Sequence, residues 1–214
     1  MQNEKLLSFK LFNKMIRCLL FSMICIAPAS SFAKKIMILG DSLSAGYGIN
    51  PHQGWVDLLQ KRLNQQYPKQ HTVVNASVSG ETTSGALARL PKLLKTHQPE
   101  IVVIELGGND GLRGQPPQMI QKNLVQLIQQ SQKAKATVLI FGMKIPPNYG
   151  TAYSKAFENN YKIVSQKYQL KLLPFFMQGI AGNKSLMQKD LIHPNTSAQK
   201  ILLDNAYPYI KGAL

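Results

Sequence analysis

The sequence predicts a three-layer α/β domain in which helices cover both faces of a five-stranded parallel sheet. The first observation is a set of five short runs rich in Val, Ile and Leu. Their near-continuous apolar character is typical of strands buried on both faces. The second is that segments with helical spacing separate the runs, which predicts parallel strands joined by right-handed crossovers. The chain has no internal repeat or linker that would divide it, which indicates one domain.

The strands are expected where the apolar runs lie. In chain order they are 35–39 (KIMIL), 72–78 (TVVNASV), 100–107 (EIVVIELG), 136–143 (ATVLIFGM) and 170–176 (LKLLPFF). Helices are expected between them, from residue 55 and over about 83–96, 117–133 and 151–168, from apolar residues at helical spacing. A last helix follows HPNTSAQ, with Asn195 or Thr196 as its N-cap, and is expected to end near Tyr207.

The first 33 residues are predicted to be an export signal rather than part of this domain. Three lysines and an arginine precede an apolar stretch of 12 residues (18–29), and SFA (31–33) supplies the small residues that a signal peptidase requires. The apolar stretch is shorter than the roughly 20 residues that span a bilayer, which disfavours the alternative of an uncleaved anchor. Cleavage after Ala33 would leave residues 34–214 as the domain, either periplasmic or secreted.

The composition of residues 34–214 excludes some kinds of site. Both cysteines, Cys18 and Cys25, lie in the predicted signal, so the processed chain has no thiol nucleophile, disulfide or Cys-based metal site. It keeps 21 basic and nine acidic residues, a net charge of +12, which attracts polyanions such as anionic lipid head groups. The lysines are scattered and no nucleic-acid motif is present, so we expect no specific binding of nucleic acid.

Ser42 is the first candidate catalytic residue. Ligands of open parallel sheets bind beyond the carboxyl ends of the strands, and Ser42 lies where the first strand turns toward a helix. A serine hydroxyl is a poor nucleophile unless a base accepts its proton. Two of the histidines, His71 and His97, lie at the amino ends of strands and therefore belong to the opposite edge of the sheet.

His193 is the preferred base, and His52 in the extension of the first loop is a reserve candidate. Asp190 precedes His193 by three residues in the loop that opens the last helix. A turn with this spacing can bring the carboxylate to one imidazole nitrogen and leave the other nitrogen for Ser42. The Asp-x-x-His pattern alone is weak, because charged turns are common, and it gains weight when it is paired with a serine at a strand's carboxyl end.

Acyl transfer also requires donors aimed at the developing oxyanion. Gly80 follows the second strand, where a residue without Cβ lets its backbone N–H approach a ligand closely. Asn109 follows the third strand and can donate from its carboxamide, and Ser42 N–H would be a further donor. Taken singly, each glycine and Asn109 is also typical of an ordinary turn. Their agreement across neighbouring loops favours an active site.

These residues stand in the order of the four motif blocks of a known enzyme family. The blocks are Gly40-Asp41-Ser42-Leu43, Gly80, Gly107-Gly108-Asn109-Asp110 and Asp190-Leu191-Ile192-His193. By these motifs the chain resembles the SGNH, or GDSL, hydrolases. Further stretches such as VVNASVSGET, LARLPKLLKTHQP and ELGGNDGLRG resemble its subgroup of exported bacterial thioesterases, lysophospholipases and arylesterases.

The resemblance implies a flavodoxin-like strand order, a Ser–Asp–His triad, and no metal or cofactor. By this resemblance Ser42 is the nucleophile, His193 the base and then the acid, and Asp190 the group that orients His193. Ser42 N–H, Gly80 N–H and the Asn109 side chain would form the oxyanion hole. The other motif carboxyls, Asp41 and Asp110, are expected to hold loops.

A substrate loop is also implied by the resemblance, over residues 143–150, which would rearrange around the acyl chain. Its candidate residues are Ile145, Pro146, Pro147, Asn148 and Tyr149. From the residues alone, two prolines close after a strand are equally typical of a rigid connector.

The resemblance and the residues together predict a serine hydrolase of carboxylic esters and thioesters. Its partners would be small-molecule or lipid acyl esters, with transient contact with an anionic membrane surface, and the protein would be a monomer. Two alternatives remain open, a carbohydrate O-deacetylase of the same family and a non-catalytic envelope protein that binds lipid. Variable stretches such as 48–55 and 179–186 leave the size of the substrate undetermined.

Overall fold

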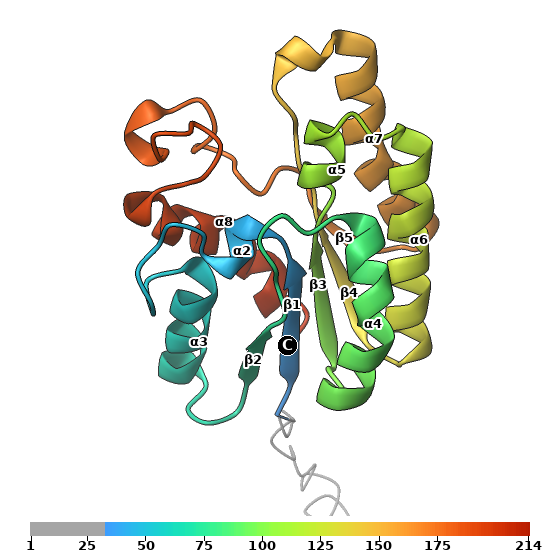
Figure 1. The fold of residues 1–214 in the computed structure, drawn as a ribbon. Coiled ribbons are helices and arrows are strands. Elements are labelled where there is room, and N and C mark those ends of the chain that lie inside the picture. Colours follow the sequence, from blue (N-terminus) through green and yellow to red (C-terminus); the bar gives the residue numbers. More distant parts are fainter. Residues whose placement is uncertain (1–32) are drawn as a thin grey trace, which may run out of the picture. The chain divides into compact units, whose positions relative to one another are not determined.

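The computed structural model describes residues 33–214, which form an α/β domain with one five-stranded sheet (Figure 1). The strands are β1 (Lys35–Gly40), β2 (Thr72–Asn75), β3 (Ile101–Glu105), β4 (Thr137–Phe141) and β5 (Lys171–Leu173). All neighbours are parallel and the order is β2-β1-β3-β4-β5, so the predicted fold class is confirmed. The predicted export segment lies outside the described residues, apart from Ala33.

The order of the strands determines which loops are neighbours. β1 pairs with β2 on one side, where Ile38 is opposite Asn75, and with β3 on the other, where Ile38 is opposite Val103. Because the strands are parallel, their carboxyl ends lie at one edge of the sheet. The loops after β1, β2 and β3 are therefore adjacent, as the predicted site requires.

Helices cover both faces of the sheet. On one face α3 (Trp55–Gln66) packs against α8 (Gln199–Lys211), and on the other α6 (Pro117–Lys133) packs between α4 (Thr83–His97) and α7 (Thr151–Lys167) (Figure 1). The shorter helices are α2 (Ser42–Ala45) and α5 (Gly108–Leu112), with 3₁₀ turns η1 (Pro147–Tyr149), η2 (Lys184–Leu186) and η3 (Thr196–Ala198). In residues 33–214 no helix is both long and apolar enough to cross a bilayer.

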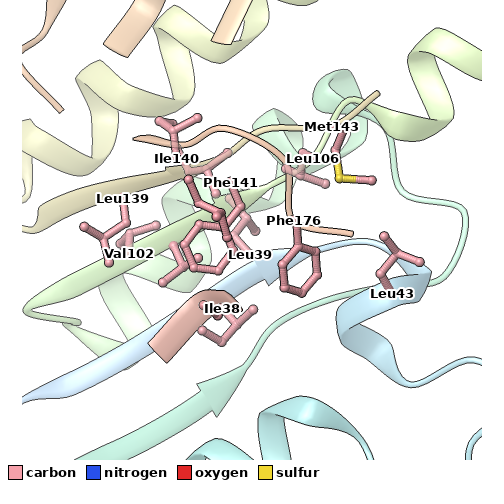
Figure 2. Close-up of a cluster of buried hydrophobic side chains, with 14 of the residues drawn as sticks. Ile38, Leu39, Leu43, Val102, Leu106, Leu139, Ile140, Phe141, Met143 and Phe176 are labelled. Atoms are coloured by element: carbon pink, nitrogen blue, oxygen red, sulfur yellow. The ribbon is translucent and has the colours of Figure 1, made fainter. Parts of the chain in front are cut away.

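The core explains why the apolar runs form the central strands. Every residue of β3 is buried, and so are Ile36 to Gly40 of β1. On the face covered by α3 and α8, the Trp55 ring packs against Phe141 and Phe176, with ring centroids 6.3 and 5.3 Å away. Figure 2 shows the buried cluster around Phe141 and Phe176, which extends to Leu43 in α2. The short α2 is therefore anchored in the core of the domain.

The observed end of β2 differs from the predicted one. The second strand was expected over 72–78 and ends at Asn75. The next residues still follow β1, since Ala76 N donates to Ile38 O (2.9 Å) and Val78 N donates to Gly40 O (3.1 Å). The apolar run therefore continues beside β1, but without the regular pairing of a strand.

The last helix differs from its prediction at both ends. A 3₁₀ turn precedes α8, and the Asn195 side chain donates to Ser185 O (2.8 Å) instead of capping a helix. At the other end, α8 continues through Pro208 to Lys211, beyond the predicted end at Tyr207. Pro208 costs the helix one backbone hydrogen bond, whereas the longer helix fully buries Ile210 in the same turn. Burial of this apolar side chain favours the longer helix.

Candidate active site

Three side chains from two loops form a hydrogen-bonded series at the carboxyl edge of the sheet. Ser42 begins α2 directly after β1, and its Oγ lies 2.9 Å from His193 Nε2. His193 Nδ1 lies 2.6 Å from Asp190 Oδ2. The structure thus brings together the three residues that the sequence singled out, although Ser42 and His193 are 151 positions apart.

The turn that presents Ser42 depends on its neighbours in the motif. Asp41 occupies the N-cap of α2, and its Oδ1 accepts a hydrogen bond from Leu43 N (3.0 Å). At Gly40 a Cβ atom would lie 2.7 Å from Glu105 Oε2 and 2.8 Å from Ser44 Oγ. Only glycine fits here without displacing these side chains. The strand can therefore turn into the helix with Ser42 at the first helical position.

The Asp190–His193 turn is held by the same carboxylate that orients the imidazole. Asp190 Oδ1 accepts hydrogen bonds from the backbone N–H groups of His193 and Ile192, both at 3.0 Å. The hydrogen bond from the His193 backbone lowers the pKa of Asp190 most, partial burial opposes it, and the pKa settles at about 2. Asp190 is thus ionised at neutral pH, and its second oxygen is directed at His193 Nδ1.

The predicted oxyanion donors lie on the loops after β2 and β3, the two neighbours of β1. Gly80 has φ +78°, which glycine adopts readily, and its carbonyl accepts a hydrogen bond from Arg113 Nη2 (3.1 Å). Asn109 lies in α5 and donates one hydrogen of its carboxamide to Asp41 Oδ2 (3.2 Å). The second hydrogen of this NH₂ group is left for an acceptor in the site.

The two other motif carboxyls hold loops, as expected. Asp110 accepts hydrogen bonds from the backbone N (2.9 Å) and the Oγ1 (2.6 Å) of Thr83, which ties α5 to the start of α4. Asp41 caps α2 and also orients Asn109. Burial raises the pKa of Asp41 to about 6, although the Leu43 and Asn109 hydrogen bonds favour its ionised form.

A buried network behind Ser42 was not found from the sequence. Glu105, the last residue of β3, is fully buried, and its Oε2 accepts hydrogen bonds from Ser44 Oγ (2.7 Å) and Asp41 N (3.4 Å). Trp55 Nε1 donates to the same Ser44 hydroxyl (3.2 Å). Burial raises the pKa of Glu105 well above its usual range. A charged residue inside an apolar strand run was the available sequence signal.

Gln188 is a second residue that the sequence did not identify. Its Nε2 donates to Tyr47 O (2.7 Å) and to Pro194 O (3.0 Å), so one amide links the loop after Ser42 to the residue after His193. A Cβ at Gly48, where φ is +69°, would overlap this amide. The Tyr47 ring in turn packs 4.6 Å from the His193 ring, centroid to centroid.

The other histidines do not take part. The side chain of His52, the reserve candidate, is 84% exposed and lies 3.8 Å from Asp57 in α3. His71 accepts a hydrogen bond from Lys34 N (3.2 Å) at the amino end of the sheet. Within residues 33–214 no cluster of three or more His, Cys, Asp or Glu could hold a metal ion.

The predicted substrate loop packs against the helix that carries Asn109. Ile145 is buried, and its Cγ2 lies so close to Gly111 that a Cβ there would approach it to 2.7 Å. Tyr149 donates from its hydroxyl to Leu112 O (2.8 Å). Pro146, Pro147 and Asn148 are exposed. This loop is therefore in contact with α5 from both of its ends.

Comparison with known proteins identifies the family. The chain is 47% identical over 182 residues to esterase TesA of Pseudomonas aeruginosa, covering 85% of this chain and 90% of that one. It is 45% identical over 172 residues to thioesterase 1/protease 1/lysophospholipase L1 of Escherichia coli, covering 80% and 81%.

Comparison with solved structures points to the same relatives. The crystal structure of TesA superimposes with a TM-score of 0.82 at 47% identity, covering 85% of this chain and 100% of that one. Esterase EstA from Pseudoalteromonas sp. gives 0.80 at 46% identity, covering 84% and 97%. Residues 38–201 match the GDSL-like Lipase/Acylhydrolase family, and this chain belongs to that family.

Proposed function

We propose that this chain is an exported serine esterase that hydrolyses carboxylic ester and thioester bonds of acyl substrates through an acyl-enzyme on Ser42. The observation that carries the proposal is the hydrogen-bonded series Asp190–His193–Ser42, with distances of 2.6 and 2.9 Å. A serine beside an imidazole that a carboxylate orients is the arrangement that nucleophilic acyl transfer requires.

In the first half-reaction Ser42 Oγ attacks the acyl carbonyl carbon while His193 Nε2 takes the hydroxyl proton. The ionised Asp190 holds Nδ1–H and stabilises the imidazolium that forms. The carbonyl oxygen becomes an oxyanion, and Ser42 N–H, Gly80 N–H and the Asn109 amide donate to it. When the tetrahedral intermediate collapses, the bond to the leaving oxygen or sulfur breaks and His193 gives that atom its proton.

The second half-reaction releases the acid. His193 takes a proton from a water molecule, whose oxygen attacks the acyl carbonyl carbon of the ester on Ser42. A second tetrahedral intermediate forms with the same oxyanion donors, and its collapse breaks the bond to Ser42 Oγ. His193 returns the proton to Ser42, so that the enzyme is regenerated and the carboxylic acid leaves.

We assign residues 1–33 as an export signal cleaved near Ala33 and residues 34–214 as the hydrolase domain, a monomer in the periplasm or outside the cell. The basic residues and short apolar stretch before SFA support this assignment. Lysophospholipid fits such a compartment better than acyl-CoA, since CoA esters are cytosolic. Mass spectrometry of the exported protein tests the assignment, because its chain should begin at Lys34.

The catalytic proposal is tested with p-nitrophenyl esters from acetyl to palmitoyl. Ser42→Ala and His193→Ala should each lower kcat by about 10⁴-fold or more with little effect on folding. Ser84→Ala, at an exposed serine of α4, and His52→Ala are matched controls that should retain activity. Full activity of Ser42→Ala would refute the nucleophile, and activity confined to acetyl would favour a deacetylase.

A further inference from the structure

The exposed apolar side chains are concentrated around the candidate active site. In residues 33–214 six large apolar side chains are strongly exposed, and only two of them, Met119 and Ile163, lie on the long helices α6 and α7. The other four lie on the loops that carry Ser42, Gly80 and His193. These four, which we name the apolar rim, are Tyr47, Val78, Leu191 and Ile192, with exposed fractions of 52, 45, 57 and 48%.

Contacts in the structure relate the apolar rim to the candidate active site. The Tyr47 ring packs on the His193 ring, with 4.6 Å between centroids. Leu191 and Ile192 are the two residues between Asp190 and His193. Val78 N donates to Gly40 O (3.1 Å), two residues before Ser42. The four side chains therefore come from segments that are joined to the proposed nucleophile or base. Apolar residues scattered singly over a surface would show no such relation to the site.

Leu191 combines two unfavourable features. Its φ is +57°, in the left-handed region that side chains other than Gly, Asn and Asp rarely adopt, and its apolar side chain is the most exposed of the rim. The turn does not need leucine, because it is held by the Asp190 carboxylate and by Leu191 N donating to Gln188 O (3.0 Å). Asn or Gly would satisfy this backbone better. A conformational outlier of this kind at a candidate active site points to a functional use of the side chain.

The exposed charge around the rim is mainly basic. The exposed basic residues of the loops after β1, β2, β3 and β5 that form no ion pair within the described residues are Arg113, Lys184 and Lys189. All acidic residues of the same loops except Asp190 are buried or paired with a cation. Asp41 and Asp110 are buried, Glu81 pairs with Arg89 (2.6 Å), and Asp190 keeps its negative charge beside the His193 ring (2.6 Å). The exposed charge at this edge is therefore mainly positive.

We propose that the apolar rim docks on an anionic phospholipid surface and that Ser42 acts on acyl esters presented there. Apolar side chains on a basic face can enter the boundary between head groups and acyl chains, while the cations are attracted to the anionic head groups. Docking would place the lipid directly beside His193, which Tyr47 contacts. The second part of this proposal rests on the proposed esterase function, whereas docking itself does not.

Docking is measured by cosedimentation of the processed protein, carrying Ser42→Ala so that no lipid is consumed. The vesicles are phosphatidylcholine alone or with phosphatidylglycerol. We expect binding to the anionic vesicles that weakens as salt is added, because salt screens the attraction. Absence of binding to anionic vesicles, or equal and salt-independent binding to both kinds, would overturn the proposal.

Leu191→Asn in the same background tests whether vesicle binding depends on the apolar rim or on any exposed apolar side chain. Asn tolerates the left-handed backbone, so the melting temperature should not fall, whereas the partition coefficient should drop about fivefold to tenfold through the lost apolar surface. Met119→Gln removes a similarly exposed apolar side chain from α6 and should leave binding unchanged. Equal losses in both variants, or no loss at Leu191, would refute the rim as the docking surface.

The active protein distinguishes the two proposals. Vesicle binding by Ser42→Ala without any ester hydrolysis by the unaltered protein would refute the esterase and leave docking standing. Hydrolysis of soluble esters without vesicle binding would refute docking and leave the esterase function standing.

Discussion

Asp41→Asn should abolish most of the activity while leaving the fold intact. In the structure Asp41 Oδ1 accepts from Leu43 N (3.0 Å) and Oδ2 accepts from Asn109 Nδ2 (3.2 Å). Asn is as good an N-cap as Asp, so the variant keeps the first hydrogen bond. The second oxygen becomes an NH₂ group, which places two donors opposite each other.

The Asn109 carboxamide then has to rotate so that its oxygen accepts from the new amide. This rotation removes the side-chain donor from the oxyanion hole, and loss of one such donor costs about 10²–10³-fold in kcat. The variant also loses a negative charge that favours the imidazolium of His193 in the transition state. We therefore expect kcat for p-nitrophenyl butyrate to fall by at least about 100-fold.

The stability of the Asp41→Asn variant, unlike its activity, should not fall. Because burial raises the pKa of Asp41 from 3.8 to about 6, the folded state disfavours the ionised carboxyl, and stability falls as the pH rises through this interval. Asn carries no charge, so at pH 7 the melting temperature of the variant should be unchanged or higher. A lower melting temperature would show that the hydrogen bonds of the ionised Asp41 carboxyl outweigh the cost of burying its charge.

A double-mutant cycle provides the control. If Asp41 acts through Asn109, then Asp41→Asn added to Asn109→Ala should lower kcat far less than it does in the unaltered protein. The reasoning is refuted if Asp41→Asn costs less than about tenfold, since one lost oxyanion donor costs more. Full additivity of the two substitutions would likewise contradict the link between them.

Three further predictions concern folding, pH and the substrate loop. Gly142→Ala should lower the free energy of unfolding by about 1–3 kcal/mol or more, because its Cβ would overlap Pro174 O and lie 3.1 Å from Leu173 O, both backbone atoms. Urea unfolding measures this loss of stability, and an unchanged midpoint of the transition would contradict the prediction. Asp190 has a pKa of about 2 in the fold against an ordinary 3.8, so its contribution to stability is present above pH 3.8 and is lost as the pH falls toward 2. Acid titration of Asp190→Asn should therefore show a shallower loss of stability over this interval, and superimposable curves would rule out the linkage. Pro146→Ala should change kcat for long-chain esters more than for short-chain esters if residues 143–150 rearrange around the acyl chain, and equal changes would make the loop a rigid connector.

The fold was predictable because its main determinant is local. Each central strand is a short run of apolar residues, and burial on both faces of a parallel sheet requires such runs. The placement of the candidate site residues was predictable for a related reason, since parallel strands bring their following loops to one edge. Ser42, Gly80 and Asn109 could therefore be placed on adjacent loops without knowledge of any contact.

Other features depend on contacts that no local pattern encodes. The end of α8 was placed too early because Pro208 is a helix-breaking signal, whereas burial of Ile210 is decided by the sheet it meets. Gln188 has no sequence signal at all, because glutamine in a polar loop is ordinary. Its role follows from the distance of one amide to two carbonyl groups, one of which belongs to Tyr47, 141 residues away.

Glu105 shows why a buried polar network can be suspected from sequence but not assigned. A glutamate at the end of an apolar strand must find donors or lose its charge, and either outcome was possible for EIVVIELG. In the structure Glu105 Oε2 accepts a hydrogen bond from Ser44 Oγ, which itself accepts one from Trp55 Nε1, while burial raises the pKa of the carboxyl well above its usual range. Asp41 N also donates to it, so both sides of Ser42 are tied to one carboxyl in the core. Because α2 is only four residues long, its own hydrogen bonds cannot hold it rigidly. The position of Ser42, the proposed nucleophile, is therefore determined by the core of the domain, through Glu105, rather than by the loop in which it lies.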